Sequence, residues 1–218
     1  MCGIIAYNGP KRAAEVVLKG LKKLEYRGYD SWGILTLQNN QFCINKKIGK
    51  IGEVKIGDLR GRDIKRRVGR DIACNVSASL QIGIGHTRWA THGGVTQRNA
   101  HPHLSNSGRF AVVQNGIVEN FEELKSQLKL KGYKFKSETD TEVIANLIEE
   151  AIVTEAQNAN LKTQNHNSKL KTFLNGTRKA FLKLEGRNAI VVLDKETGEI
   201  VALRQGSPLL VGVGQNEY

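Results

Sequence analysis

The hydrophobic and polar positions along the chain predict short strands interrupted by amphipathic helices. The first run, "CGIIAY", is apolar and strand-like, and the next segment, 11–27, repeats apolar residues at helical spacing. One face of that helix is predicted to carry Ala14, Val17, Leu21 and Leu24. Asn39-Asn40 separates two strand-like runs and predicts a hairpin. Strands are predicted at residues 31–37, 41–48, 80–86, 110–114, 188–194, 199–204 and 209–213.

Two helix starts have the spacing of a capping box, in which a polar residue stands three positions before a glutamate. Asn120 precedes Glu123 in this way, and Thr139 precedes Glu142. The helix that follows Asn120 should end just before Gly132, because glycine suits the left-handed conformation found after many helix ends.

The order of the elements predicts the fold class. The polar, aperiodic stretch 154–169 predicts a flexible loop, and apolar spacing predicts a third helix over about 170–185. Strand, helix, hairpin, strands, helices and strands follow one another without regular βαβ alternation. This order favours an α+β fold with helices packed outside antiparallel sheets.

The composition is that of a globular protein. The chain has 218 residues, of which 39% are hydrophobic and 25% charged. This is enough for a sizeable core in one domain or two small ones. We expect no membrane span and no secretory signal. Three cysteines do not make a disulfide framework, so we expect a cytoplasmic location.

The charge raises the question of nucleic-acid binding. The formal net charge is +12, and the densest basic cluster is "RGRDIKRRVGR" at 60–70. Such a cluster could neutralise phosphates, but it lacks interleaved aromatic residues. A solvated basic loop is therefore favoured, and nucleic acid is not expected as a partner.

Cys2 stands where a thiol is unusual, because termini fray and thiols oxidise. If Met1 is removed, which a small second residue permits, Cys2 carries both a thiol and an α-amino group. An α-amine with a pKa of about 8 can act as the base for the thiol, so no histidine is needed. Taken alone, Cys2 favours the alternative of a small buried residue in an N-terminal strand.

The stretch "GHTRWATHGG" at 85–94 and the "NAHPH" at 99–103 together contain four histidines. Their spacing matches no common zinc pattern, so no metal is expected. Gly93-Gly94 would allow a mobile loop. Arg88 could bind a carboxylate in a bidentate manner, through two parallel N–H···O hydrogen bonds. Trp89 suits the core and a lid equally.

Three further residue positions are candidates with ordinary alternatives. Asn115-Gly116 follows a strand and could form an oxyanion hole or a simple turn. Asp140 could stabilise the start of a helix or bind a substrate ammonium. Arg27 lies in a tight connection and could help to order the nucleophile end of the chain.

Taken in order, these motifs resemble one family. The motifs are "MCGIIAY", "LEYRGYDS", "GHTRWATHG", "NAHPH", "QNGIVEN", "SETDTEVI" and "GSPLLVGVG". Their order and spacing are similar to those of the N-terminal glutaminase domain of glutamine–fructose-6-phosphate amidotransferases. These domains are class II glutamine amidotransferases with an N-terminal nucleophile hydrolase fold. The resemblance covers nearly the whole chain and implies a four-layer αββα sandwich of two antiparallel sheets.

The resemblance also implies a catalytic mechanism. Cys2 would attack the side-chain amide of glutamine and form a thioester, while its α-amine moves the proton. Asn115 and Gly116 match the family's oxyanion hole. Water would then release glutamate, and no cofactor is implied.

The resemblance further implies how glutamine is held. Arg88 matches the residue that binds the α-carboxylate, and Asp140 matches the one that binds the α-ammonium. Thr91 and His92 match the loop that lines and covers the substrate. Trp89 matches a tryptophan that gates the path of ammonia.

The chain departs from the family pattern at several positions. Trp32 stands where the family has alanine, which predicts overpacking unless the neighbours are smaller. Gln114 replaces a histidine, and Gly94-Val95 replaces an acidic residue and a proline. The domain, 2–218, is expected to be incomplete at its C-terminus, without its last strands and without the sugar isomerase domains.

The sequence therefore predicts glutamine hydrolysis that supplies ammonia for making glucosamine 6-phosphate from fructose 6-phosphate. The synthase half of that reaction would need a second chain, and a homo-oligomer is the other partner considered. The alternatives are another class II amidotransferase, or a regulatory remnant that binds glutamine without turning it over.

Overall fold

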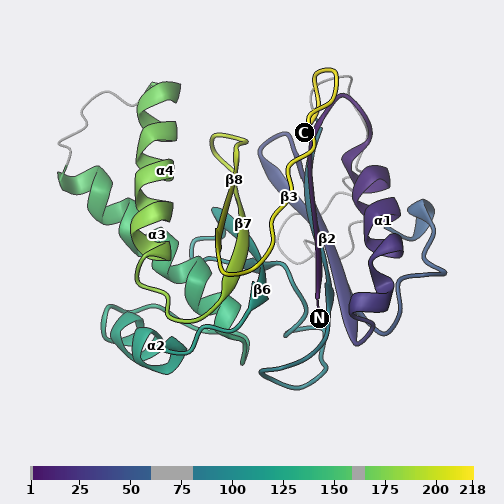
Figure 1. The fold of residues 1–218 in the computed structure, drawn as a ribbon. Coiled ribbons are helices and arrows are strands. Elements are labelled where there is room, and N and C mark those ends of the chain that lie inside the picture. The colour runs from purple at the N-terminus through teal and green to yellow at the C-terminus, as the bar shows by residue number, and fades with distance from the viewer. Residues whose placement is uncertain (1, 60–80, 159–164) are drawn as a thin grey trace, which may run out of the picture. The chain divides into compact units, whose positions relative to one another are not determined.

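The computed structural model describes residues 2–59, 81–158 and 165–218, and the chain divides into two compact units (Figure 1). Unit 1 comprises Met1–Pro102 and Leu210–Tyr218, and unit 2 comprises His103–Leu209. Each unit contains one four-stranded sheet in which every neighbouring pair is antiparallel. The predicted α+β class is confirmed. The basic cluster at 60–70 lies outside the described residues.

In unit 1 the strand order is β1-β4-β2-β3, and helix α1 packs on this sheet. Its elements are β1 (Gly3–Gly9), α1 (Ala13–Lys23), a 3₁₀ helix (Glu25–Arg27), β2 (Ser31–Gln38), β3 (Gln41–Ile48), a second 3₁₀ helix (Ile56–Asp58) and β4 (Gln81–Arg88). The register places Gly3 opposite Thr87 and Ser31 opposite Arg88. The start of β1 and the end of β4 therefore lie at the same end of the sheet.

The predicted hairpin is confirmed, and the face of the first helix is partly corrected. Asn39 and Asn40 have φ angles of 47° and 56°, as a two-residue type I′ turn requires. The buried residues of α1 are Ala13, Val17, Leu18 and Leu21. Ala14, predicted on the buried face, is only partly buried. Leu24 lies at the C-cap, where the helical rotation has already ended.

The core of unit 1 accommodates Trp32, which is 1% exposed. Trp32 packs in one cluster with residues of α1 and with Ile34 of the same strand. On this face β4 presents Gly85, where a Cβ would lie 2.5 Å from Cγ1 of Val17. The absence of a side chain there lets α1 approach the sheet closely, on the face where the Trp32 indole is buried.

In unit 2 the strand order is β5-β6-β7-β8, and three helices complete the unit (Figure 1). Its elements are β5 (His103–Leu104), β6 (Phe110–Gly116), α2 (Phe121–Leu130), α3 (Asp140–Asn158), α4 (His166–Phe181), β7 (Asn188–Asp194) and β8 (Ile200–Gln205). Its core joins β6 and β7 to all three helices, and the rings of Phe110 and Phe173 stack at 5.8 Å. Within the described ranges, no helix has both the length and the apolar character needed to cross a membrane.

The first predicted capping box is wrong. Asn120 stands at the N-cap of α2, but its side chain donates to the carbonyl of Lys183 at 2.9 Å and accepts from the amide of Glu185 at 3.1 Å. It therefore ties the start of α2 to the segment before β7. The predicted end of this helix is confirmed, because Gly132 follows it with a φ of +88°.

The second predicted capping box is displaced by two residues. Glu142 accepts hydrogen bonds from the amides of Lys136 and Ser137, at 2.8 Å and 2.6 Å, and not from Thr139. The Thr139 hydroxyl instead lies 3.0 Å from Nε2 of His103. Glu142 thus holds the chain that leads into α3.

The predicted loop at 154–169 and the third predicted helix both need correction. Helix α3 continues to Asn158, and α4 begins at His166, where Asn165 accepts the amide of Ser168 at 2.9 Å as an N-cap. Residues 154–158 and 166–169 of the predicted loop are therefore helical, and residues 159–164 lie outside the described part of the chain. The third helix starts and ends about one turn earlier than predicted.

The strand predicted at 209–213 is wrong. Leu210 is 95% exposed and Val213 is 76% exposed, so these apolar residues do not pack in a sheet. The segment instead reaches unit 1, where Tyr218 exchanges two backbone hydrogen bonds with Asn8 of β1. Alternation of apolar residues alone could not reveal this tertiary pairing.

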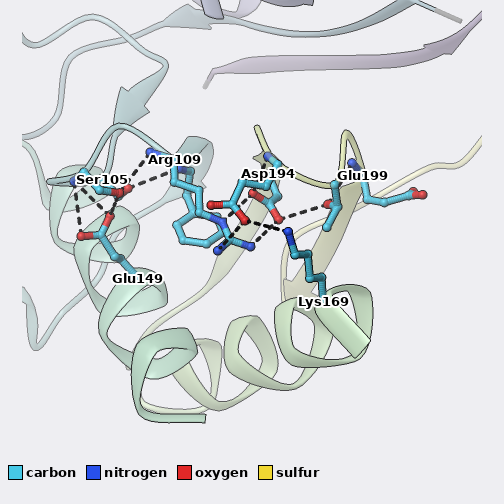
Figure 2. A network of polar contacts seen from close by, with 10 residues as sticks. Ser105, Arg109, Glu149, Lys169, Asp194 and Glu199 are labelled. Atoms are coloured by element: carbon cyan, nitrogen blue, oxygen red, sulfur yellow. Dashed lines mark hydrogen bonds and ion pairs between the residues drawn. The ribbon is translucent and has the colours of Figure 1, made fainter. Parts of the chain in front are cut away.

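An ion pair between the partly exposed Arg109, directly before β6, and the buried Asp194 joins β6 to the end of β7 (Figure 2). Asp194 is fully buried, and the Arg109 guanidinium donates to both of its oxygens, at 2.8 Å and 2.9 Å. The same carboxylate accepts the amide of Glu196 and the hydroxyl of Thr197, which shapes the turn into β8. The pair therefore fixes one end of the sheet.

Replacing Arg109 with methionine should lower the free energy of unfolding by about 3–5 kcal/mol, because the Asp194 carboxylate would remain buried without its cation. Urea denaturation measures this change. The control is Arg12→Met, which removes an exposed ion pair to Glu15 and should cost less than about 1 kcal/mol. Equal losses in the two variants would contradict the prediction.

Candidate active site

The Cys2 thiol is held at the start of β1 by the backbone of Trp89. The Trp89 amide donates to Sγ at 3.2 Å, and the thiol lies 3.6 Å from the Trp89 carbonyl oxygen. Arg27 donates through Nε to the Cys2 carbonyl at 3.4 Å. Cys2 is thus neither frayed nor a fully buried core residue, since it is part of an ordered polar arrangement.

Burial raises the pKa of the Cys2 thiol, and this effect exceeds the opposing ones of the Trp89 amide and the nearby Arg88 charge. The thiol is therefore protonated at neutral pH. A protonated thiol is a poor nucleophile, so any covalent chemistry at Cys2 requires a base.

Arg88 is buried, and its guanidinium organises the loop that follows it. Nη1 donates to the carbonyl of Gly94 at 3.1 Å, and Nη2 donates to the carbonyls of Gly93, at 3.1 Å, and His92. Thr91 lies exposed on this loop and His92 is half-buried. In this conformation Arg88 bonds the covering loop itself.

Trp89 is 45% exposed, which excludes the core alternative for its ring. The ring meets Tyr29 edge-on at 5.4 Å. Sequence reasoning did not single out Asp30, whose carboxylate accepts the Ala90 amide at 2.9 Å. Asp30 therefore fixes the backbone beside Trp89, and only the pairing of distant segments reveals it.

In unit 2, Asn115 and Gly116 lie at the end of β6 opposite Ala189 and Asn188, so the simple turn alternative is wrong. Gly116 has a φ of +123°, and a Cβ there would lie 2.0 Å from the carbonyl oxygen of Arg187. Glycine is therefore required at this position.

Asp140 is the first residue of α3 and is 6% exposed. Its Oδ2 accepts the Val118 amide at 3.0 Å and Nε2 of Gln114 at 3.3 Å. The carboxylate thus turns toward the end of β6, and among the described residues it forms no ion pair. The positive end of the α3 dipole stabilises its charge.

The histidines do not form a metal-binding group in the part of the chain that the structure describes, where no three potential ligand residues cluster. The rings of His86 and His101 lie 4.0 Å apart, and His103 contacts Thr139. The predicted site residues fall into two sets. Cys2, Arg27, Arg88, Trp89, Thr91 and His92 belong to unit 1, and Asn115, Gly116 and Asp140 belong to unit 2.

An open depression of about 410 Å³ adjoins Gly116 in unit 2. Ile117, Glu119 and Arg187 line it together with the turn that follows β8. The proposed oxyanion residue thus borders a space that a small ligand can reach.

Comparisons with known proteins agree with the sequence motifs. Residues 60–160 match the family model described as "Glutamine amidotransferase domain". Over its whole length, the chain is 43% identical to the glutamine–fructose-6-phosphate aminotransferase (isomerizing) of Aquifex aeolicus and 44% identical to that of Pyrococcus horikoshii. It spans 31% of each of these relatives.

Solved structures share the fold. The glutamine phosphoribosylpyrophosphate amidotransferase from B. subtilis matches 91% of this chain, over 36% of its own, with a TM-score of 0.63 and 22% identity. An allosteric regulatory enzyme of purine biosynthesis matches 87% of this chain, over 35% of its own, with a TM-score of 0.62 and 25% identity. The chain is thus similar to glutamine amidotransferase domains: residues 60–160 match the family model, and the whole chain aligns with about a third of each aminotransferase.

Proposed function

We propose that this chain hydrolyses the side-chain amide of glutamine, with Cys2 as the nucleophile. The observation that carries the proposal is the anchoring of the Cys2 thiol by the Trp89 amide at 3.2 Å, in a chain that aligns throughout with glutamine-dependent aminotransferases. Anchoring of this kind fixes the direction from which sulfur can attack an acyl carbon.

The proposed reaction begins after removal of Met1. The α-amine of Cys2 accepts the thiol proton as sulfur bonds to the amide carbon of glutamine. The Asn115 side-chain amide and the Gly116 N–H stabilise the negative oxygen of the tetrahedral intermediate. The amine then returns the proton to the leaving nitrogen, and ammonia departs from a thioester. Water, activated by the same amine, cleaves the thioester and releases glutamate.

Substrate binding is proposed to use the remaining residues. Arg88 pairs with the α-carboxylate of glutamine, which requires it to exchange bonds that it now makes to its own loop. Asp140 pairs with the α-ammonium. The loop at Thr91 and His92 covers the substrate, and Trp89 lies on the route by which ammonia leaves.

The names of the relatives support a role in amino-sugar synthesis. Ammonia from this domain would aminate fructose 6-phosphate to give glucosamine 6-phosphate at a synthase site in the remaining two thirds of such a protein or in a partner chain. The identity of 43–44% to aminotransferases, against 22–25% to the solved amidotransferases, favours this acceptor. We propose a cytoplasmic location for this pathway step.

Substituting Cys2 with alanine should reduce glutamate release from glutamine by about 1,000-fold or more, because no other side chain replaces the nucleophile. A coupled glutamate assay measures the rate. Cys43→Ala is the matched control, since Cys43 is a partly buried cysteine on β3. Equal activity of Cys2→Ala and the control would overturn the proposal.

Insertion of a lysine between Met1 and Cys2 should block removal of Met1 and lower activity by about 100-fold or more, because the base becomes a peptide nitrogen. Intact-mass analysis reports the N-terminus, and the glutamate assay reports the rate. Proteolytic trimming of the same chain back to Cys2 should restore activity. Full activity of the untrimmed chain would show that another group acts as the base.

Replacing Asp140 with asparagine should raise KM for glutamine by about 10- to 150-fold, which is the fold-change that corresponds to the free energy of a hydrogen bond between charged groups. The effect on kcat should be smaller, because the ammonium is remote from the bond that breaks. Steady-state kinetics separates the two constants. Asp58→Asn, at an exposed position, is the control and should leave both unchanged.

A further inference from the structure

We propose that Gln114 is a positioning residue that orients two groups at once. One is the Asp140 carboxylate, which would bind the ammonium, and the other is the backbone at 116–118, which includes the Gly116 N–H that would stabilise the oxyanion. This inference rests on the proposed hydrolysis of glutamine and extends it to a residue outside the predicted site. Gln114 lies on β6 directly before Asn115 and is buried.

The side chain of Gln114 bridges three neighbouring residues. Its Nε2 donates to Oδ2 of Asp140 at 3.3 Å and to Oδ1 of Asn188 at 2.7 Å. Its Oε1 accepts from the hydroxyl of Thr141. All three partners are buried, and they come from α3 and β7. The amide therefore joins the oxyanion strand to the start of α3 and to the adjacent strand.

The contacts of Asp140 decide which of its oxygens meets a ligand. Both hydrogen bonds that its carboxylate accepts, from Gln114 and from the Val118 amide, end on Oδ2. Within the described residues no cation pairs with it. Neutral donors thus orient Oδ2 and leave the negative charge for an ammonium at Oδ1.

The same contacts hold the backbone that would stabilise the oxyanion. The Val118 amide is bonded to Asp140, and Nδ2 of Asn188 donates to the Ile117 carbonyl at 3.3 Å. Asp140 and Asn188 therefore hold the segment 116–118 by hydrogen bonds, and Gln114 bonds both of these residues. A displacement of Gln114 would misplace both the ammonium site and the Gly116 N–H.

A glutamine suits this position because it offers two donor hydrogens and one acceptor oxygen. A neutral imidazole, like the histidine of the family pattern, offers one donor and one acceptor, so it cannot reproduce all three contacts. A carboxylate would replace the donor with an acceptor beside Asp140, and two carboxylates at that distance repel each other.

The test compares Gln114→Glu with Gln127→Glu in otherwise unchanged protein. Gln127 is a matched control, because its Nε2 also donates to a carboxylate, that of Glu123, at 3.0 Å on the exposed face of α2. At about pH 8, Gln114→Glu should raise KM for glutamine by about 30-fold or more and also lower kcat, whereas Gln127→Glu should change neither.

The pH profile separates positioning from loss of packing. Of the three hydrogen-bond partners of Gln114 described above, Asp140 is a carboxylate, and Asn188 and Thr141 are neutral. At about pH 5.5 one carboxyl of the new pair is protonated and donates to the other, so the KM ratio of Gln114→Glu to wild type should fall by about 5-fold or more. A ratio that is raised equally at both pH values would overturn the proposal.

A second variant covers the case in which Gln114→Glu does not fold. Gln114→His should raise KM by about 3- to 10-fold, because it keeps only part of the network. An unchanged KM in Gln114→His, or in a folded Gln114→Glu, would overturn the positioning role.

Failure of the proposed function is distinguishable from failure of this inference. If wild type releases no glutamate, the hydrolysis proposal fails by itself. Calorimetric titration of glutamine into the Cys2→Ala protein then tests positioning without chemistry, and adding Gln114→Glu should weaken binding by about 30-fold relative to adding Gln127→Glu. Equal affinities would overturn the inference.

Discussion

A buried carboxylate that has no cation partner among the described residues is the constraint on which the rest of unit 2 depends. The Asp140 carboxylate lies at the start of α3, where neutral donors and the helix dipole stabilise it within the part of the chain that the structure describes. A buried anion is costly unless it is hydrogen-bonded, so β6, α3 and β7 must meet in one geometry. That geometry brings Gln114, the Val118 amide and Asn188 together, and it places Gly116 in a conformation that only glycine adopts. The burial of Asp140 and the proposed recognition of glutamine therefore both require β6, α3 and β7 to meet in this geometry.

Unit 1 solves a different problem, which is to order a residue near the end of the chain. Cys2 is hydrogen-bonded to the Trp89 backbone and to Arg27. The Arg88 guanidinium donates to carbonyls of the loop that follows it. Burial raises the pKa of the thiol, so a base is needed to form the reactive thiolate. In the proposed mechanism, the α-amine of Cys2 is the base that activates this thiol. In this arrangement the loop conformation and the availability of Arg88 are linked, because the guanidinium cannot bond both the loop carbonyls and a carboxylate in full.

The two units use their glycines and polar residues for close contact rather than for flexibility. Gly85 allows α1 to lie close to its sheet, where Trp32 is buried in the same cluster as residues of α1. Arg109 and Asp194 fix the far end of the second sheet through two parallel hydrogen bonds. Each of these contacts fixes the packing within its own unit.

The sequence by itself determined the class of fold, most strands and helices, and the set of motifs that marks a glutamine amidotransferase domain. Local rules were sufficient there, because hydrophobic period, turn residues and motif order are encoded within short segments. Only the tertiary structure decided that Asn120 bonds the distant backbone of Lys183 and Glu185 rather than capping its helix. It also decided that residues 209–213 form no strand, and that Gln114 connects Asp140 to Asn188. Each of these outcomes depends on which buried polar atom meets which partner, and that choice is made by packing between segments far apart in the chain.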